Sequence, residues 1–126
     1  MPSYDDHQFS PPAPMAKVTL RHPENETMAT EASLLIDTGA DVTLIPQSAI
    51  DLLEIEASSD EAYELVGFDG SMSLARAVRL DLIFLRRIFK GRYLIIEQEY
   101  GILGRDILNH LSLIFDGPQL FWEEKR

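Results

Sequence analysis

The chain has 126 residues, which suits one domain and leaves little room for a second. It contains no cysteine, which excludes a disulfide framework, a cysteine protease and cysteine-ligated zinc. The formal net charge of −10 argues against a nucleic-acid partner, because nucleic acid carries charge of the same sign. The apolar stretches fall well short of a membrane span, and residues 1–16 lack the apolar core of a secretory signal, so we expect a cytoplasmic protein without a membrane partner.

The N-terminal residues 1–15 are polar and rich in proline, so we expect a flexible arm before a single domain of residues 16–126. Apolar and polar side chains alternate in residues 16–21, which predicts a strand. After a turn, residues 27–37 predict a second strand that becomes fully apolar near its end. This hairpin would carry Asp37 to the end of its second strand.

The remainder of the chain predicts many short strands separated by turn signals, which is typical of an all-β, closed barrel-like fold with one or two short helices. The expected elements are a strand at 42–45, a helix at 47–53, a solvent-facing acidic loop at 54–64, a hairpin at 64–72, a strand at 73–85, a turn at 90–92, a strand at 93–96, a short helix at 105–110 and a closing hairpin at 112–123.

The tripeptide Asp37-Thr38-Gly39 is the most informative motif. It lies between the apolar residues 34–36 and the segment 40–45. A carboxylate at the end of an apolar strand is expensive to bury, because desolvation favours its neutral form or a partner that shares its proton. Hydrolysis of peptide bonds by a pair of carboxylates is the best available reason for such an acid.

Two segments carry a resemblance to a known family. Residues 34–45 resemble the active-site strand and turn of the retropepsin-like aspartic proteases, the retroviral proteases and their cellular and prokaryotic relatives. Residues 101–108 resemble the second signature of that family, in which two apolar residues and a glycine precede an arginine and an Asp or Asn that open a short helix. The likeness covers residues 16–123 and implies the retropepsin (acid protease) fold.

The resemblance implies that Asp37 is the catalytic carboxylate. Aspartic proteases use two such acids, and this chain has a single triplet of this kind. The second Asp would therefore come from another copy of the chain, which implies a homodimer with the active site on its two-fold axis. An extended peptide or protein would be the substrate, and neither a metal nor another cofactor would be needed.

The resemblance also assigns supporting roles to Thr38, Gly39, Ala40, Asp41 and Arg105. In the family, the matching threonine bonds across the dimer axis, and the glycine leaves room for substrate and water. The acid at Asp41 would form a bidentate ion pair with Arg105 and hold the active-site loop against the helix. Asp106 has a simpler interpretation, as a cap of that helix.

The hairpin tip that follows the acidic loop resembles the flap that closes over substrate in this family. Its residues are Val66, Gly67, Phe68, Asp69, Gly70 and Ser71. The sequence of the tip departs from the retroviral flap, and Asp69 adds a charge above the site. Apolar residues near the site are candidates for pocket walls, although any one of them is more often core: Val42, Ile45, Val66, Phe68, Leu82, Phe84 and Ile102.

The best interpretation is an aspartic endopeptidase that is active as a homodimer. Two alternatives stay open. The same dimeric fold could hold peptides without cutting them, or the domain could act as an adaptor whose dimerisation is its role. An active-site-dependent cleavage assay separates the enzyme from the peptide-binding module. Substitution of Asp37 by Asn separates the enzyme from the adaptor, because the enzyme would lose turnover and keep its dimer, whereas the adaptor would lose nothing.

Overall fold

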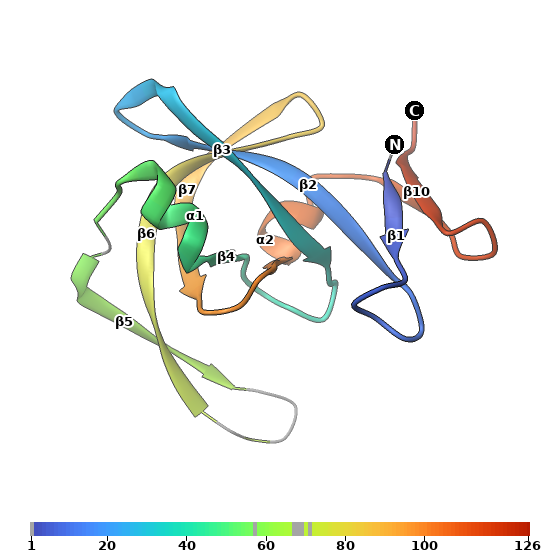
Figure 1. Ribbon diagram of the computed structural model, residues 1–126, viewed down its shortest axis with the longest axis horizontal. Helices are drawn as coiled ribbons and strands as arrows, with labels where there is room; N and C mark the ends of the chain where they lie inside the picture. Colours follow the sequence, from blue (N-terminus) through green and yellow to red (C-terminus); the bar gives the residue numbers. More distant parts are fainter. Residues whose placement is uncertain (1, 57, 67–69, 71) are drawn as a thin grey trace.

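The computed structural model describes residues 2–56, 58–66, 70 and 72–126. In these ranges the backbone forms ten strands and two short helices (Figure 1). The strands are β1 (Ser3–Asp5), β2 (Ala13–His22), β3 (Asn25–Ile36), β4 (Leu44–Pro46), β5 (Ser58–Val66), β6 (Met72–Phe84), β7 (Arg87–Ile96), β8 (Gly101–Leu103), β9 (Leu113–Asp116) and β10 (Phe121–Glu124). The helices are α1 (Gln47–Leu53) and α2 (Arg105–Leu108). The predicted all-β class with short helices is therefore confirmed.

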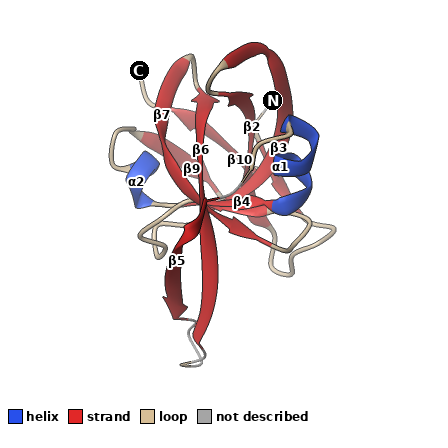
Figure 2. Ribbon diagram, turned by 90° about the vertical axis from the view of Figure 1, so that its left-hand side faces the viewer, coloured by secondary structure: helices blue, strands red, loops and turns tan. Residues whose placement is uncertain are grey.

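Six strands close into a barrel. The strand order in the sheet is β5-β6-β7-β4-β8-β3-β2-β1-β10-β9, and a further antiparallel pairing joins β6 to β2. The strands from β6 to β2 therefore form a ring, with β5 beyond one end of this order and β1, β10 and β9 beyond the other. Figure 2 shows β5 projecting below the other labelled strands. Within the ring, β8 pairs in parallel with β3, so that both strands end at the same edge.

Aliphatic side chains fill the barrel, as the alternation of apolar residues predicts. Leu20, Leu34 and Leu80 have no exposed surface, although they come from three different strands. The helix α1 spans the residues predicted for it and buries Ala49, Ile50 and Leu53. Pro46, which has no N–H to satisfy, precedes its first turn. The structure contains no helix, among its described residues, that is long and apolar enough to cross a membrane.

The ring closes at a barrel seam, the pairing of residues 19–21 on β2 with residues 81–83 on β6. Arg21 and Asp81 lie directly opposite one another in this register. Nε and Nη2 of Arg21 donate hydrogen bonds of 3.2 and 2.9 Å to Oδ2 of Asp81, and the Asp81 side chain is 5% exposed. A buried carboxylate needs a paired cation and hydrogen bonds, and the seam supplies both.

The turn predicted at residues 90–92 is wrong, because β7 runs without a break from Arg87 to Ile96. The chain reverses instead at Leu85 and Arg86, which have φ angles of 52° and 64°. Gly91 lies inside this strand, opposite Leu80 in the β6–β7 ladder. A Cβ there would lie 3.4 Å from the Tyr93 hydroxyl, within van der Waals contact, and that hydroxyl donates to the carbonyl of Phe89 at 2.9 Å.

Two segments predicted to be irregular pair with neighbouring strands. Within the expected arm of residues 1–15, β1 pairs with both β2 and β10, and β2 already begins at Ala13. Within the expected acidic loop, β5 pairs with β6 from Ser58 onward, with one irregularity of register between Ser58 and Ala62. In both places backbone pairing with neighbouring strands overrides a local composition that disfavours strands.

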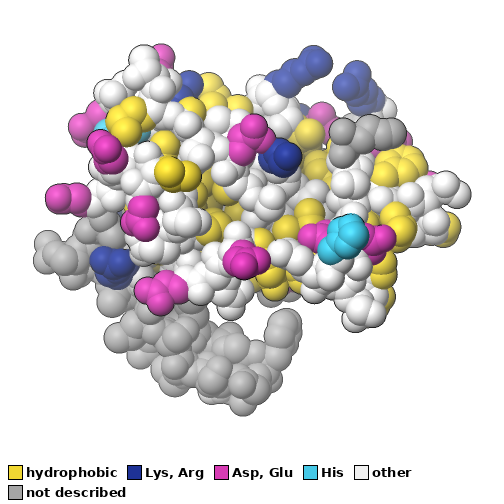
Figure 3. Space-filling model, in the orientation of Figure 1, with side chains coloured by type: hydrophobic (Ala, Val, Ile, Leu, Met, Phe, Trp, Pro, Cys, Tyr) yellow, Lys and Arg dark blue, Asp and Glu magenta, His cyan; other side chains and the backbone are white. Residues whose placement is uncertain are grey.

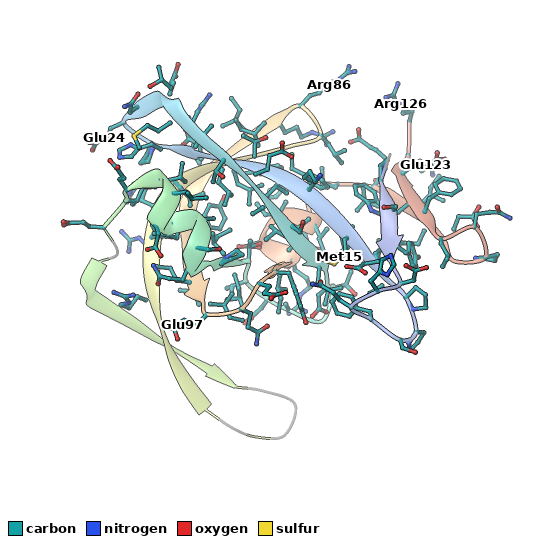
Figure 4. The ribbon with its side chains drawn as sticks, viewed as in Figure 1. Met15, Glu24, Arg86, Glu97, Glu123 and Arg126 are labelled. Carbon is teal, nitrogen blue, oxygen red and sulfur yellow. The ribbon has the colours of Figure 1, made fainter. Side chains whose placement is uncertain are left out.

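The C-terminal hairpin packs against the barrel through Trp122 on β10. The Trp122 side chain is buried and its ring centroid lies 5.7 Å from that of Phe84. Its indole Nε1 donates a hydrogen bond of 2.9 Å to the carbonyl of Met15, a residue labelled in Figure 4. The indole thus satisfies its donor while its ring fills the core.

Candidate active site

Asp37 lies one residue beyond the end of β3. The parallel ladder with β8 continues to it, because the Asp37 N–H donates to the carbonyl of Leu103 at 3.1 Å. Its Oδ1 accepts a hydrogen bond of 2.8 Å from the N–H of Gly39, and the N–H of Ala40 donates to the Asp37 carbonyl at 3.2 Å. Because the strand fixes its backbone and the turn fixes one oxygen, the carboxylate has a defined direction.

Arg105 holds the loop that follows Asp37. Its Nη1 donates a hydrogen bond of 2.7 Å to the carbonyl of Thr38, and its backbone N–H donates to the carbonyl of Ala40 at 2.9 Å. A Cβ added to the neighbouring Gly104 would lie 2.5 Å from the carbonyl oxygen of Val42, a distance that real Cβ atoms do not reach. The beginning of α2 therefore approaches this loop closely enough to require glycine.

A second set of hydrogen bonds, which we call the Thr43–Asp106 clamp, fixes the far side of the loop. Thr43 is fully buried, and its N–H and Oγ1 donate to the Asp106 carboxylate at 3.1 and 2.6 Å. The Thr43 hydroxyl in turn accepts a hydrogen bond of 3.0 Å from the N–H of Gly104. One threonine side chain thus connects the active-site loop to the start of α2 as both donor and acceptor.

The clamp corrects the sequence-based interpretation of two acids. Asp106 makes no capping hydrogen bond with the end of α2 and bonds Thr43 instead. The predicted ion pair between Asp41 and Arg105 is absent from the described part of the chain, because Arg105 bonds the Thr38 carbonyl and Asp41 is exposed. The sequence held two signals for the clamp. Asp106 directly follows Arg105, and the hydroxyl residue Thr43 lies six residues after Asp37.

The hairpin of β5 and β6 occupies the place of the expected flap, and its last pair is Val66 opposite Met72. At its tip, Gly70 has a φ angle of 83°, which favours glycine. The remaining tip residues predicted for the flap, Gly67, Phe68, Asp69 and Ser71, lie outside the described residues. Figure 1 shows the hairpin extending away from the barrel.

Several of the residues considered as walls of substrate pockets lie in the hydrophobic core or pack against it. Ile45, Leu82 and Phe84 are buried in the main core. Val42 and Ile102 are half-buried and pack on a smaller cluster of Leu44, Ala75, Ala77 and Leu94. A cavity of about 960 Å³ lies beside the N-terminal residues, and Asp37 does not line it.

The N-terminal loop contacts the loop that leads into β8. Nε2 of Gln8 donates to Oε2 of Glu99 at 3.3 Å, and the rings of Phe9 and Tyr100 meet edge to face with centroids 5.1 Å apart. As for metals, the described residues contain no group of three or more His, Cys, Asp or Glu side chains placed to bind an ion.

A comparison with known protein families identifies the family to which the chain belongs. Residues 11–115 match the family described as retroviral aspartyl protease, and this match spans Asp37, the loop, the clamp and α2. The chain belongs to the retroviral aspartyl protease family. It is thus a retropepsin-type aspartic protease in family and in fold.

A solved structure with the same fold is the EIAV protease in complex with the inhibitor HBY-793. It is 25% identical in sequence and aligns over 78% of this chain and 86% of that chain with a TM-score of 0.59. A search of curated proteins found no match. The family and this relative are proteases, so the chain is assigned to the hydrolases at the level of the family.

Proposed function

We propose that this retropepsin is an active aspartic endopeptidase whose catalytic centre forms from the Asp37 side chains of two subunits. The main support is the fixed position of Asp37 at the end of β3, within a loop that hydrogen bonds connect to β8 and α2. One chain carries one Asp-Thr-Gly triplet, whereas a carboxylate pair needs two. A two-fold axis close to Asp37 would supply the second.

Two neighbouring carboxylates share one proton, which is the established behaviour of aspartic proteases. The ionised Asp37 would take a proton from a bound water as the water oxygen attacks the carbonyl carbon of the scissile bond. The protonated Asp37 of the other subunit would donate a hydrogen bond to the carbonyl oxygen, where negative charge develops. Collapse of the tetrahedral intermediate breaks the C–N bond, and the leaving nitrogen takes up a proton from the pair.

The surrounding residues have supporting roles in this proposal. Thr38 would bond across the subunit axis, and Gly39 and Ala40 would leave room for the substrate backbone. Arg105 would position the loop through the Thr38 carbonyl, and Asp41, which is exposed, would contact the substrate backbone. Each of these residues would act by fixing or admitting groups around the reacting carbonyl.

The substrate in this proposal is an extended segment of peptide. It would lie between the Asp37 loop and the β5–β6 hairpin, whose tip residues 66–71 would close over it and exclude water. An extended peptide adds main-chain hydrogen bonds in the manner of a further strand, so its backbone would contribute much of the affinity.

The decisive experiment is cleavage of an unstructured protein across pH 4 to 7, with wild type and Asp37→Asn compared at several concentrations. Dimer population is measured in parallel by sedimentation. We expect a bell-shaped dependence on pH, because one carboxyl must be neutral and the other ionised. Activity should follow the dimer population and disappear in Asp37→Asn while the dimer remains.

A well-folded wild-type dimer that binds peptides and cleaves none would overturn the proposed activity. It would instead favour a peptide-binding module of the same fold. Cleavage that persists in Asp37→Asn would identify a contaminant or a different catalytic group.

A further inference from the structure

Strand β7 has a free edge along its first half. Residues 94–96 of β7 pair in parallel with β4, which has three residues. Residues 87–93 pair with β6 on one side, and within the described residues no strand pairs with their other side. The open stretch belongs to the β6–β7 hairpin, which Figure 1 shows at the opposite end of the molecule from the β5–β6 hairpin.

The hairpin register shows which backbone groups point to this edge. The two-residue turn is flanked by Phe84 and Arg87, which form a hydrogen-bonded pair, and bonded and non-bonded pairs alternate from there. The N–H and C=O groups of Ile88 and Lys90 therefore point away from β6. The Leu94 N–H, in the same phase, donates to the residue before β4 at 3.3 Å, which agrees with this assignment.

The same hairpin concentrates positive charge in an acidic chain. Residues 82–96 contain three arginines, one lysine and no acid, although the chain carries a net charge of −10. Arg86 and Lys90 are exposed and make no ion pair among the described residues. Figure 3 shows Lys and Arg side chains projecting at the margin where Figure 4 labels Arg86 and Arg126. Salt limits the reach of surface charges to about 8 Å, so a ligand at the hairpin meets these cations rather than the net charge of the chain.

One carboxylate of the chain is already bound at this hairpin. Nη1 of Arg87 donates a hydrogen bond of 2.7 Å to Oε2 of Glu124, and both side chains are partly exposed. Glu124 belongs to β10, a strand that does not pair with β7. The cations of the hairpin therefore accept a carboxylate from a different strand at the protein surface.

The turn at the tip contains residues that suit its backbone poorly. Leu85 and Arg86 have φ angles of 52° and 64°, whereas a two-residue turn with positive φ angles favours asparagine and glycine. Leu85 packs against the main core, which explains its position. Arg86 is exposed, so packing does not explain an arginine there. Residues held in strained backbone are typical of functional surfaces.

The chemistry of the edge favours an extended protein segment as its occupant. Unpaired N–H and C=O groups are costly in a lipid core, whereas an added strand pairs them. A second copy of this edge would gather Arg86 and Lys90 of both copies along one line, and like charges on facing strands are destabilising. An acidic segment would instead be attracted, and Ile88, which is 51% exposed, offers it an apolar contact.

We propose that the free edge of β7, residues 87–92, binds an extended acidic segment of a partner protein as an added strand. An antiparallel segment exchanges backbone hydrogen bonds with Ile88 and Lys90. It places an acidic side chain opposite Lys90 and an apolar one opposite Ile88, and it brings a further acid to Arg86. This edge does not include Asp37, so the inference goes beyond the proposed function and does not depend on it.

Fluorescence anisotropy of a labelled peptide on the full-length protein tests the proposal. In the peptide, glutamate alternates with threonine, and one valine takes the place opposite Ile88. The protein carries Asp37→Asn so that the peptide stays intact. We expect Lys90→Glu to weaken binding at least about fivefold, because an attraction becomes a repulsion. Lys17→Glu is the matched control, since Lys17 is an exposed strand lysine, and it should stay within about twofold.

Methyl groups on the peptide backbone test the added strand without a change of charge. An N-methyl group on the peptide residue opposite Lys90 removes the N–H that would bond the Lys90 carbonyl. It should weaken binding at least about tenfold. An N-methyl group on the next residue, whose N–H points away from β7, should change the affinity less than about twofold.

The outcomes decide the occupant of the edge. A peptide that does not bind, or that loses equal affinity with either N-methyl position, would overturn the added strand. Equal weakening by Lys90→Glu and Lys17→Glu would overturn it as well, because attraction to the whole surface would explain the binding. Binding to phosphatidylserine vesicles that Lys90→Glu abolishes, without peptide binding, would identify a lipid surface instead. If Lys90→Glu fails to fold, as judged by circular dichroism, the two N-methyl peptides decide.

Discussion

The barrel seam and the active-site loop are each held by a carboxylate whose partner is more than fifty positions away in the chain, yet the two use different chemistry. At the seam, the buried Asp81 is paired with the Arg21 guanidinium. At the loop, the exposed Asp106 accepts two hydrogen bonds from the neutral, buried Thr43. A buried ion pair is costly to break, whereas hydrogen bonds from a neutral residue to an exposed carboxylate fix geometry at a smaller cost. The seam should therefore control folding, and the clamp should control the position of Asp37.

The largest expected effect is that of Asp81→Ala. It leaves the half-buried Arg21 guanidinium without its partner, which should lower the free energy of unfolding by about 3 kcal/mol in urea denaturation. The double variant Arg21→Met, Asp81→Leu should recover most of that loss, because apolar side chains of similar volume replace the pair. A loss below about 1 kcal/mol in Asp81→Ala would mean that water solvates the seam.

Thr43→Val tests the clamp. The change keeps the shape but leaves the Gly104 N–H and one Asp106 oxygen without their partner, which should cost about 1–3 kcal/mol of unfolding free energy. Catalytic turnover should fall by more than this loss of stability explains, because the loop loses its anchor. Thr43→Ser, which keeps the hydroxyl, should retain both properties; equal loss in the two variants would point to packing.

A smaller loss of stability is expected for Arg105→Ala, and none for Asp41→Ala. Arg105→Ala removes a hydrogen bond to the Thr38 carbonyl and should cost about 1 kcal/mol in thermal or urea unfolding. Asp41→Ala should stay within about 0.5 kcal/mol of wild type, because no ion pair with Arg105 exists to be lost. An equal loss of unfolding free energy in the two variants would support the ion pair between Asp41 and Arg105 that the sequence predicts.

The smallest effect concerns alkaline pH. Burial, assisted by the charges of Asp106 and Asp81, raises the pKa of the Tyr93 phenol above its usual range. An unfolded tyrosine loses its phenol proton at about pH 10, whereas folded Tyr93 still holds its proton at that pH. The stability that depends on this proton is complete below about pH 10 and decreases above it. Urea midpoints of Tyr93→Phe should therefore fall less steeply than those of wild type at alkaline pH, and parallel curves would contradict the shift.

Local patterns allowed much of this fold to be predicted. An apolar run followed by Asp37-Thr38-Gly39 locates the active-site strand, and the residues after Pro46 indicate α1 with its observed limits. The turn at residues 90–92 was expected because glycine is a turn signal, whereas Gly91 pairs with Leu80 inside the β6–β7 ladder. The expected arm and acidic loop became strands because their backbone pairing, with β2 and β10 in one case and with β6 in the other, is not visible in their local composition.

The site was predictable in part. Asp37 and the helix that begins at Arg105 follow from motifs, but the partner of each side chain depends on distances that a sequence does not contain. Thr43 and Asp106 are 63 positions apart, and the sequence-based interpretation gave the contact between loop and helix to Asp41 and only a capping role to Asp106. The sequence identifies the acids near the site, and the geometry of β8 between β3 and β4 decides which one binds the loop.

The parallel insertion of β8 next to β3 has a consequence for the order of events during biosynthesis. The backbone partner of Asp37, Leu103, and the loop anchors Arg105 and Asp106 are made more than sixty positions after it. Translation proceeds from the N-terminus at about 5–20 residues per second, so several seconds separate Asp37 from these supports. A nascent chain therefore carries Asp37 before the residues that fix its backbone and its loop have been made.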